Sequence, residues 1–269
     1  MILANMHTHT NYCGHAQGSV KELVDAARNK NISYLGITEH YPLSKKFDPE
    51  TFLSMPAENM DAYQADVLKA RTLYDDIEIL FGCELDWLGE DEDRCFDRIE
   101  LERFDLILGS VHFIDGWAFD DPAQKDRWLD EGPDYIWRRY FDVWCDAVLS
   151  DQPFTIMAHP DLCKKFGHRP SFDPLPLYKN AAEAAREADR LIEVNTSGAF
   201  YPCAEMYPAP ALLNEFKRAG VKCSIGTDAH TPSHCARALT EGIALMYESG
   251  YREITVPTMT QDRRAIIIE

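Results

Sequence analysis

The stretch Ser33–His40, which reads SYLGITEH, shows the pattern that decides the fold. Its apolar first part is typical of a buried strand, which we expect at Ser33–Thr38, and polar residues follow at the carboxyl end of that strand. Similar short apolar runs recur along the chain, and each is followed by a longer segment with helical spacing. Repeated strand and helix units predict a parallel sheet covered by helices.

Seven such units can be drawn, and they predict strands at Ile2–Met6, Ser33–Thr38, Ile77–Cys83, Leu106–Val111, Phe154–Ala158, Leu191–Asn195 and Lys222–Thr227. Helices are expected between the strands. One is predicted at Val20–Arg28 with Ser19 as its N-cap, and another at Tyr178–Ala188, which is rich in Ala and Glu. Two segments that contain prolines and aromatic residues, Tyr41–Met60 and Asp115–Pro133, are expected to form loops over one end of a barrel.

The composition is that of one globular, acidic protein. A chain of 269 residues with 45% hydrophobic content can build one large core, so we expect a single α/β barrel domain spanning residues 1–269. The formal net charge of -18 repels polyanions, which disfavours non-specific binding to nucleic acid or to an anionic membrane. A phosphate bound by this protein would need local positive charge, and divalent cations could supply it while offsetting nearby carboxylates.

The cysteines and the N-terminal residues indicate the cellular compartment in which the protein is expected. The eight cysteines form no C-x-x-C pair and lack the density of a small secreted scaffold. The first residues lack the basic start and apolar run of a secretory signal, and no apolar stretch approaches the roughly 18 residues of a membrane span. We therefore expect a soluble cytoplasmic protein with reduced thiols.

Histidines and carboxylates gather at the carboxyl ends of the predicted strands. These positions are His7 and His9 after the first strand, His40 after the second, Glu84 after the third, His112 after the fourth, His159 after the fifth, and Asp228 and His230 after the seventh. His15 follows in a turn that can fold back over the barrel mouth. Because strand ends of a parallel barrel converge on one face, the nine side chains should line one cavity. Divalent cations would offset the cost of crowding them together.

Each of these residues has an ordinary structural explanation when taken alone. A His-x-His pair on a strand is more often a core or cross-strand pair than a metal site, and a lone histidine is most often a satisfied structural one. A lone Glu84 would be solvated or salt-bridged. Seven histidines at strand ends on one barrel face have no such explanation, so the sequence predicts a metal centre.

A basic run, Lys164–Arg169 with the sequence KKFGHR, follows the fifth strand. Such a run is usually a solvated loop, but its position beside the predicted metal centre makes phosphate binding a serious alternative. His168 in this run and His234 are the two histidines outside the predicted ligand set.

Together these residues resemble the polymerase and histidinol phosphatase (PHP) family, specifically its histidinol-phosphate phosphatase branch, over nearly the whole chain. The family pattern is carried by HTH at residues 7–9, His15, TEH at 38–40, Glu84, His112, His159 and DAH at 228–230. The branch is suggested by HTNYCGHA at 9–16, GSVH at 109–112, HPDL at 159–162, the KKFGHR run, NTSG at 195–198 and YPAPA at 207–211. Pro160 departs from the branch, which commonly has another apolar residue there.

The resemblance implies a distorted (β/α)7 TIM-like barrel with a trinuclear metal centre at the C-terminal face of its strands. One ion would be held by His7, His9, Glu84 and Asp228, a second by Glu84, His112 and His159, and a third by His15, His40 and His230. Glu84 would bridge the first two ions. Zinc is the expected metal, and iron, manganese or cobalt also suit histidine and carboxylate ligands.

The implied reaction is hydrolysis of a phosphomonoester, L-histidinol phosphate, by a metal-bridging hydroxide, with Glu84, Asp228 and His230 as catalytic residues. Arg169 is the leading candidate for holding the phosphate, because Arg can bind it through two hydrogen bonds, and Lys165 and Ser197 are weaker candidates. Glu39 or Glu193 could recognise the cationic end of the substrate. Glu39 could instead hydrogen-bond a ligand histidine.

Three other functions fit parts of the same pattern. The substrate could be a different small phosphomonoester, or the chain could be a PHP-type nuclease, although its acidic charge and lack of a basic stripe argue against DNA. A catalytically silent metal-binding module is disfavoured by the complete ligand set. The expected partner is a small phosphorylated molecule, and the sequence does not specify an oligomeric state.

Overall fold

The structure is a computed structural model and describes residues 3–90, 101–260 and 262–268. A sheet of seven parallel strands forms its centre, in the spatial order β1-β2-β3-β4-β7-β8-β9. The strands are β1 (Leu3–Asn5), β2 (Ile32–His40), β3 (Glu78–Asp86), β4 (Leu106–Ser110), β7 (Ile156–Met157), β8 (Leu191–Asn195) and β9 (Cys223–Gly226). Each corresponds to one predicted strand; Ile2, where the first was expected to start, lies outside the described residues.

The sheet closes into a barrel where the segments after β1 and β9 meet. The Met6 amide donates to the Ile225 carbonyl at 2.9 Å, and the Asp228 amide donates to the His7 carbonyl at the same distance. The Asn5 side chain adds a clamp, because its Nδ2 donates to Thr227 Oγ1 at 2.7 Å and its Oδ1 accepts from the Thr227 amide at 3.0 Å. The predicted distorted (β/α)7 barrel is therefore confirmed.

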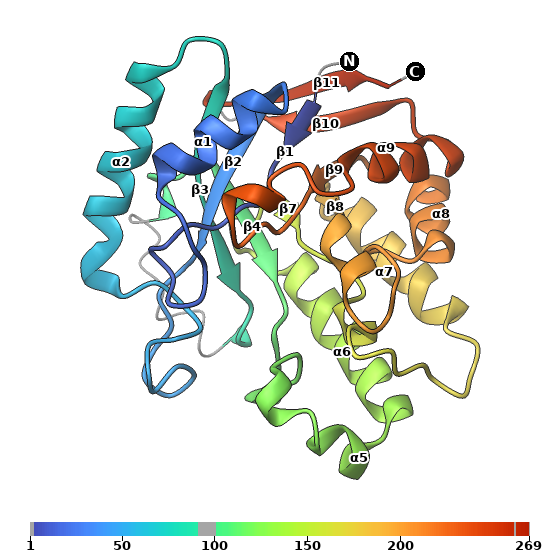
Figure 1. The fold of residues 1–269 in the computed structure, drawn as a ribbon. Coiled ribbons are helices and arrows are strands. Elements are labelled where there is room, and N and C mark those ends of the chain that lie inside the picture. The colour runs from blue at the N-terminus through green and yellow to red at the C-terminus, as the bar shows by residue number, and fades with distance from the viewer. Residues whose placement is uncertain (1–2, 91–100, 261, 269) are drawn as a thin grey trace.

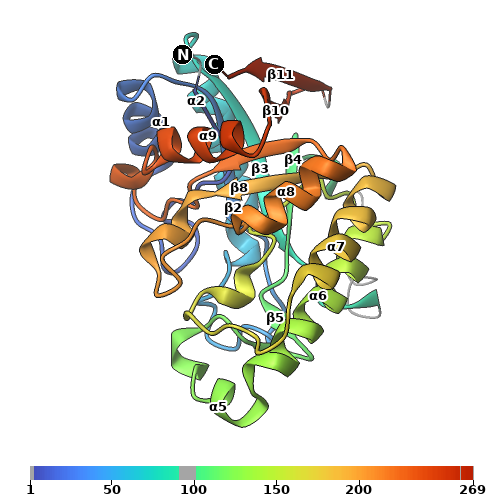
Figure 2. The ribbon, with the colours of Figure 1, turned by 90° about the vertical axis from the view of Figure 1, so that its right-hand side faces the viewer.

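Helices cover the outside of the barrel. Among the described residues these are α1 (Val20–Asn29), α2 (Met60–Leu73), α6 (Pro133–Leu149), α7 (Leu175–Glu187), α8 (Pro210–Ala219) and α9 (Leu239–Glu248). The short helix α5 (Arg127–Glu131) lies beyond the end where the strands stop, among the long loops (Figure 1). In Figure 1, α1 and α2 lie on one side of the strands, whereas α6, α7 and α8 lie on the other. Figure 2 shows these last three helices packed side by side. Within the described residues, no helix has the length and apolar character needed to cross a bilayer.

Local sequence explains where the two predicted helices begin. Ser19 accepts from the Glu22 amide, and the Glu22 carboxylate accepts from the Ser19 amide, so a capping box starts α1 where predicted. The other predicted helix, α7, starts at Leu175, three residues before its predicted start at Tyr178. Pro176 lies in its first turn, where the missing N–H of proline costs no helical hydrogen bond.

The segment Asp115–Pro133 is more ordered than the predicted loop. It contains β6 (Trp117–Ala118), which pairs with β5 (Phe113–Ile114), and the short helix α5. Trp128 anchors this segment, since its indole is buried and donates to the Phe119 carbonyl at 2.7 Å. The burial of aromatic side chains thus orders a stretch in which local pattern indicated no element.

A hairpin that the sequence analysis did not predict covers the end of the barrel where the strands begin. It consists of β10 (Glu253–Pro257) and β11 (Arg263–Ile267), which are antiparallel. Its buried residues Ile254 and Val256 join the main core. Arg264 donates to Tyr34 Oη at 2.6 Å, near the start of β2. In Figure 1 the hairpin lies at the top, and the long loops lie at the bottom, where the strands end.

Candidate metal centre

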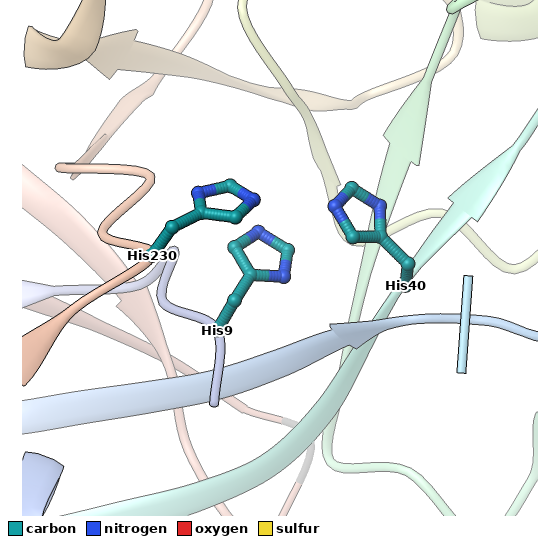
Figure 3. Close-up of side chains that lie close together, drawn as sticks. All are labelled: His9, His40 and His230. Atoms are coloured by element: carbon teal, nitrogen blue, oxygen red, sulfur yellow. The ribbon is translucent and has the colours of Figure 1, made fainter. Parts of the chain in front are cut away.

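The side chains of the nine predicted ligand residues converge at the carboxyl end of the barrel. His40 is the last residue of β2, and Glu84 lies near the end of β3. The others come from the segments after β1, β4, β7 and β9, namely His7, His9, His15, His112, His159, Asp228 and His230. Figure 3 shows the His9 ring between those of His40 and His230, with 4.3 Å between its centroid and each of theirs.

Glu84 lies at the centre of this cluster. Its two carboxylate oxygens face different sets of histidines. Oε2 lies 3.1 Å from Nδ1 of His40, 3.2 Å from Nε2 of His7 and 3.4 Å from Nε2 of His9. Oε1 lies 2.9 Å from Nε2 of His159 and 3.6 Å from Nε2 of His112. A carboxylate in this position can connect the two sets of histidines, because each of its oxygens faces one set.

Asp228 and His15 extend the cluster on the side of β9. Asp228 Oδ1 lies 3.3 Å from His9 Nε2 and 3.5 Å from His7 Nε2. The Nε2 atoms of His15 and His230 are 3.1 Å apart. Both rings therefore point into the cluster although they come from opposite ends of the sequence.

Four histidines are oriented by a partner on Nδ1 and direct Nε2 towards the cluster. The partners are Glu193 Oε1 for His7 at 2.9 Å, the Phe52 carbonyl for His15 at 2.8 Å, Asp86 Oδ1 for His112 at 2.8 Å and the Asp228 carbonyl for His230 at 3.0 Å. All four partners accept, so each Nδ1 carries the hydrogen. This arrangement is the usual one for histidines that bind a metal through Nε2.

These residues fit divalent metal ions. Because the Nδ1–H groups of His15 and His230 are both bonded to carbonyls, the Nε2 lone pairs of the neutral rings face each other, and a cation would relieve their repulsion. Among the described residues, His9 Nδ1, His40 Nε2 and His159 Nδ1 are buried without a hydrogen-bond partner. Four compact groups in the described residues offer ligand atoms within 4.8 Å of one another, and three of them consist of predicted ligands: His7, His9 and Glu84; Glu84, His112 and His159; and His9, His40 and His230. The first two lie within the ion sites implied by the resemblance, whereas the third contains His9 in place of His15.

The charges in the cluster depend strongly on each other. Burial alone would raise the pKa of Glu84, but His7, His40 and His112 hold it well below its usual range. For His112, burial lowers the pKa, whereas Asp86 and Glu84 raise it to about 10. The buried carboxylates thus require compensating positive charge. Divalent cations can provide this charge in place of protons.

Two of the predicted ligands have strained backbones. His159 has a φ of 27° and Asp228 a φ of 52°, in the left-handed region that non-glycine residues rarely adopt. Such conformations cost about 1–3 kcal/mol each and persist only where the surroundings hold them. The His159 amide donates to Glu193 Oε2 at 2.9 Å, and the Asp228 amide donates to the His7 carbonyl.

A cleft of about 320 Å³ opens onto the cluster. His15, His40, Glu84, His112, His159, Asp228 and His230 line it, while His7 and His9 are fully buried behind them. Lys165 and Ser197 also line the cleft. Lys165 Nζ lies 2.8 Å from Asp120 Oδ2 and 4.9 Å from the centre of the Tyr201 ring. Positive charge is therefore present beside the predicted ligands.

Arg169, the leading candidate for phosphate binding, does not line this cleft. Its guanidinium pairs with Glu205 at 3.1 Å and borders a separate hollow together with Trp137 and Tyr178. The basic run does not act as one patch, because Lys164 is fully buried and pairs with Asp161 at 2.9 Å. Of the run's two lysines, Lys165 is the one that lines the cleft, so of the two named candidates Arg169 and Lys165 only Lys165 lies beside the cluster.

Glu39 and Glu193 are both buried and also lie outside the cleft. Glu39 accepts from the Thr10 amide at 2.5 Å, and its Oε2 lies 4.0 Å from His9 Nδ1. Glu193 contacts His7 and the His159 amide. Both carboxylates lie behind the histidines, and neither is among the residues that line the cleft.

The sequence analysis did not single out Asp86, Asp120 or Tyr201. Asp86 could have been found, because it lies two residues after Glu84 on the same strand and thus on the same face. Asp120 and Tyr201 line the cleft from irregular segments. No periodic pattern marks such positions.

Comparisons with known proteins agree with this geometry. The model of the PHP domain family matches residues 5–201, so the chain belongs to this family. A Deinococcus radiodurans protein described as "Probable histidinol-phosphatase" is 29% identical over 94% of this chain and 96% of its own length. A Schizosaccharomyces pombe protein with the same description is 24% identical over 84% of this chain and 80% of its own.

A solved structure shares the fold. The histidinol phosphate phosphatase of Lactococcus lactis, determined in complex with zinc, L-histidinol and phosphate, superposes with a TM-score of 0.81. It is 18% identical in sequence, and the match covers 96% of this chain and 98% of that one. The barrel architecture is thus shared over nearly the full length of both proteins.

Proposed function

We propose that this protein is a metal-dependent phosphomonoester hydrolase that converts L-histidinol phosphate and water to L-histidinol and phosphate. The observation that carries this proposal is the convergence of seven histidines and two carboxylates on one cluster, which is reached through a cleft that Lys165 also lines. Membership of the PHP family and the names of the relatives, which are similar over most of both chains, support the choice of substrate.

Divalent ions held by the nine side chains would supply a strong nucleophile from water and neutralise charge on the phosphoryl oxygens. We propose three ions, with zinc as the first candidate and iron or manganese as others. Histidine nitrogen and carboxylate oxygen are good zinc ligands, and the similar L. lactis protein contains zinc. Within this centre Glu84, Asp228 and His230 would be the catalytic ligands.

The cleft residues divide the remaining tasks. Lys165 would hold the phosphate through its ammonium group, with Ser197 beside it. Asp120, which pairs with Lys165, would accept from the ammonium group of histidinol. Phe52, Phe113 and Tyr201 line the same cleft and offer faces on which an imidazole can pack. The substrate carries positive and negative charge close together, and so does this part of the cleft.

We further propose that the enzyme works in the cytoplasm and does not bind nucleic acid. The seven cysteines of the described part of the chain are free thiols, in keeping with a reducing compartment. The net charge of -18 opposes binding to polyanions.

A kinetic panel with metal-replete enzyme tests the substrate. We expect L-histidinol phosphate to be hydrolysed with a higher kcat/KM than nitrophenyl phosphate or other small monoesters. Those esters lack the ammonium group that Asp120 would bind. Elemental analysis of the same preparation identifies the metals. Equal efficiency with unrelated esters, or no turnover of L-histidinol phosphate, would contradict the substrate assignment and leave the broader phosphatase class.

A further inference from the structure

Glu193 connects the parts of the cluster that come from β1 and β7. It lies in β8 with 1% of its surface exposed. Oε1 accepts from His7 Nδ1 at 2.9 Å, and Oε2 accepts from the His159 amide at 2.9 Å and from Asn195 Nδ2 at 3.0 Å. One buried carboxylate thus contacts two predicted ligand residues that are far apart in sequence.

These contacts fix two different properties of the ligands. At His7, the carboxylate accepts from Nδ1–H, so the neutral ring has its lone pair on Nε2, the atom directed at Glu84. At His159, the carboxylate holds a backbone amide in a residue with a φ of 27°, a conformation that needs support from its surroundings.

The neighbouring strand leaves space for this carboxylate. Gly226 of β9 lies against Glu193, and a Cβ atom at this position would overlap Glu193 Oε1 and lie 2.5 Å from His7 Cβ. Residue 226 must therefore be glycine, because there is no space for a side chain beside Glu193. The φ of Gly226 is not among the positive values, so backbone conformation is not the reason.

We propose that Glu193 is a positioning residue that sets the tautomer of His7 and the backbone of His159, and thereby joins two ion sites of the centre. This inference rests on the proposed metal-dependent function. It gives Glu193 a role in metal binding in place of the substrate contact that the sequence suggested.

The Glu193→Gln variant tests the hydrogen-bond pattern with little change in shape. The His159 amide is a donor that cannot reverse, so the glutamine carbonyl must remain on that side. Asn195 cannot readily turn its oxygen towards position 193, because Oδ1 already accepts from the Ser197 amide at 2.9 Å. The glutamine NH₂ group therefore faces His7 Nδ1 and moves the hydrogen of His7 to Nε2, where it blocks metal binding.

The experiment measures zinc affinity by competition with a chromogenic chelator, and the zinc content by elemental analysis. Loss of a partner that orients a metal-binding histidine typically lowers metal affinity about 10- to 100-fold, and we expect this loss in Glu193→Gln. Long-range ¹⁵N–¹H NMR of the zinc-loaded proteins, in which metal binding keeps histidine ligands neutral, should show the hydrogen of His7 on Nδ1 in the wild type and on Nε2 in Glu193→Gln. Glu215→Gln, a change at a buried carboxylate that pairs with Arg218, is the matched control and should retain wild-type affinity.

Each outcome distinguishes the inference from the proposed function. Wild-type zinc affinity in Glu193→Gln, with an increase in KM alone, would overturn the positioning role and restore substrate contact. A wild-type protein that binds no divalent metal would refute the metal-dependent function as well as the inference. If Glu193→Gln does not fold, Gly226→Ala crowds the same contact without changing charge, and unchanged zinc affinity in that variant would equally overturn the role.

Discussion

Lys165 is the residue that we propose holds the phosphate. Its side chain is 14% exposed and lines the cleft beside the cluster. We expect Lys165→Met to lower kcat/KM about 10- to 100-fold for all phosphate esters, because a hydrogen bond from a charged donor contributes about 1.5–3 kcal/mol. Steady-state kinetics on L-histidinol phosphate and nitrophenyl phosphate would measure the loss.

Arg169→Met is the matched control for this change. Arg169 belongs to the same basic run but borders the separate hollow, so this variant should keep wild-type kcat/KM. The reverse result, with a large loss in Arg169→Met and none in Lys165→Met, would restore the original sequence-based assignment.

At the scale of single residues, the sequence predicts that histidines and carboxylates gather at the strand ends. It does not determine the direction of every side chain. His40 and Glu84 could be assigned to the same cavity because strand ends of a parallel barrel converge. The basic run begins in a 3-10 turn at Leu162–Lys164, and the geometry of this turn decides that Lys164 is buried while Lys165 reaches the cleft. Alternation and helical periodicity say nothing about such a turn.

The segment Tyr41–Met60 is the element that orients His15. Its Phe52 carbonyl accepts from His15 Nδ1. Asp48 shapes the segment, because its carboxylate accepts from the amides of Phe52, Leu53 and Ser54 at 2.8, 3.0 and 3.0 Å. We expect Asp48→Ala to disorder this turn and release His15, and so to lower the zinc retained per chain after gel filtration.

Asp173→Ala is the control for this element. Asp173 also accepts from a backbone amide, that of Leu175 at 3.0 Å, but it lies at the start of α7 and away from the cluster. Elemental analysis should find the wild-type zinc content in this variant. The same content in Asp48→Ala would show that His15 does not depend on the segment.

Elements with strong periodicity were predictable, and elements held by tertiary contacts were not. The seven strands and α1 follow from apolar runs and a capping box. The hairpin β10–β11 was missed because it follows the last strand and helix unit, so the repeating pattern gives no place for it. Its stability depends on the buried Ile254, Val256 and Ile266 and on pairing between its two strands.

At the scale of the whole molecule, the proposed metal centre would join segments from β1 to β9, so metal binding should stabilise the entire barrel. We expect a chelator to abolish activity and added zinc to restore it, while the Tm falls by about 5 °C or more. Ligand at 100 times its Kd adds about 2.7 kcal/mol, and each kcal/mol shifts Tm by about 2–4 °C in a chain of this size.

Thermal melting followed by circular dichroism, with and without chelator, measures this shift in Tm. We propose that residues 1–269 form one domain, so each melting curve should contain a single transition that moves as a unit. Full activity in protein that contains no metal by elemental analysis would contradict the metal-dependent mechanism. Two separate transitions would contradict the single domain.

The position of the cleft also has a consequence for the order in which products leave. The cleft opens at the carboxyl end of the barrel, where Phe52 and Tyr201 are 56% and 41% exposed. If the proposed function holds, phosphate at the deep cluster would depart only after the alcohol nearer the rim has left. Phosphate should therefore inhibit competitively against substrate and histidinol non-competitively, and competitive inhibition by histidinol would show that the order is reversed.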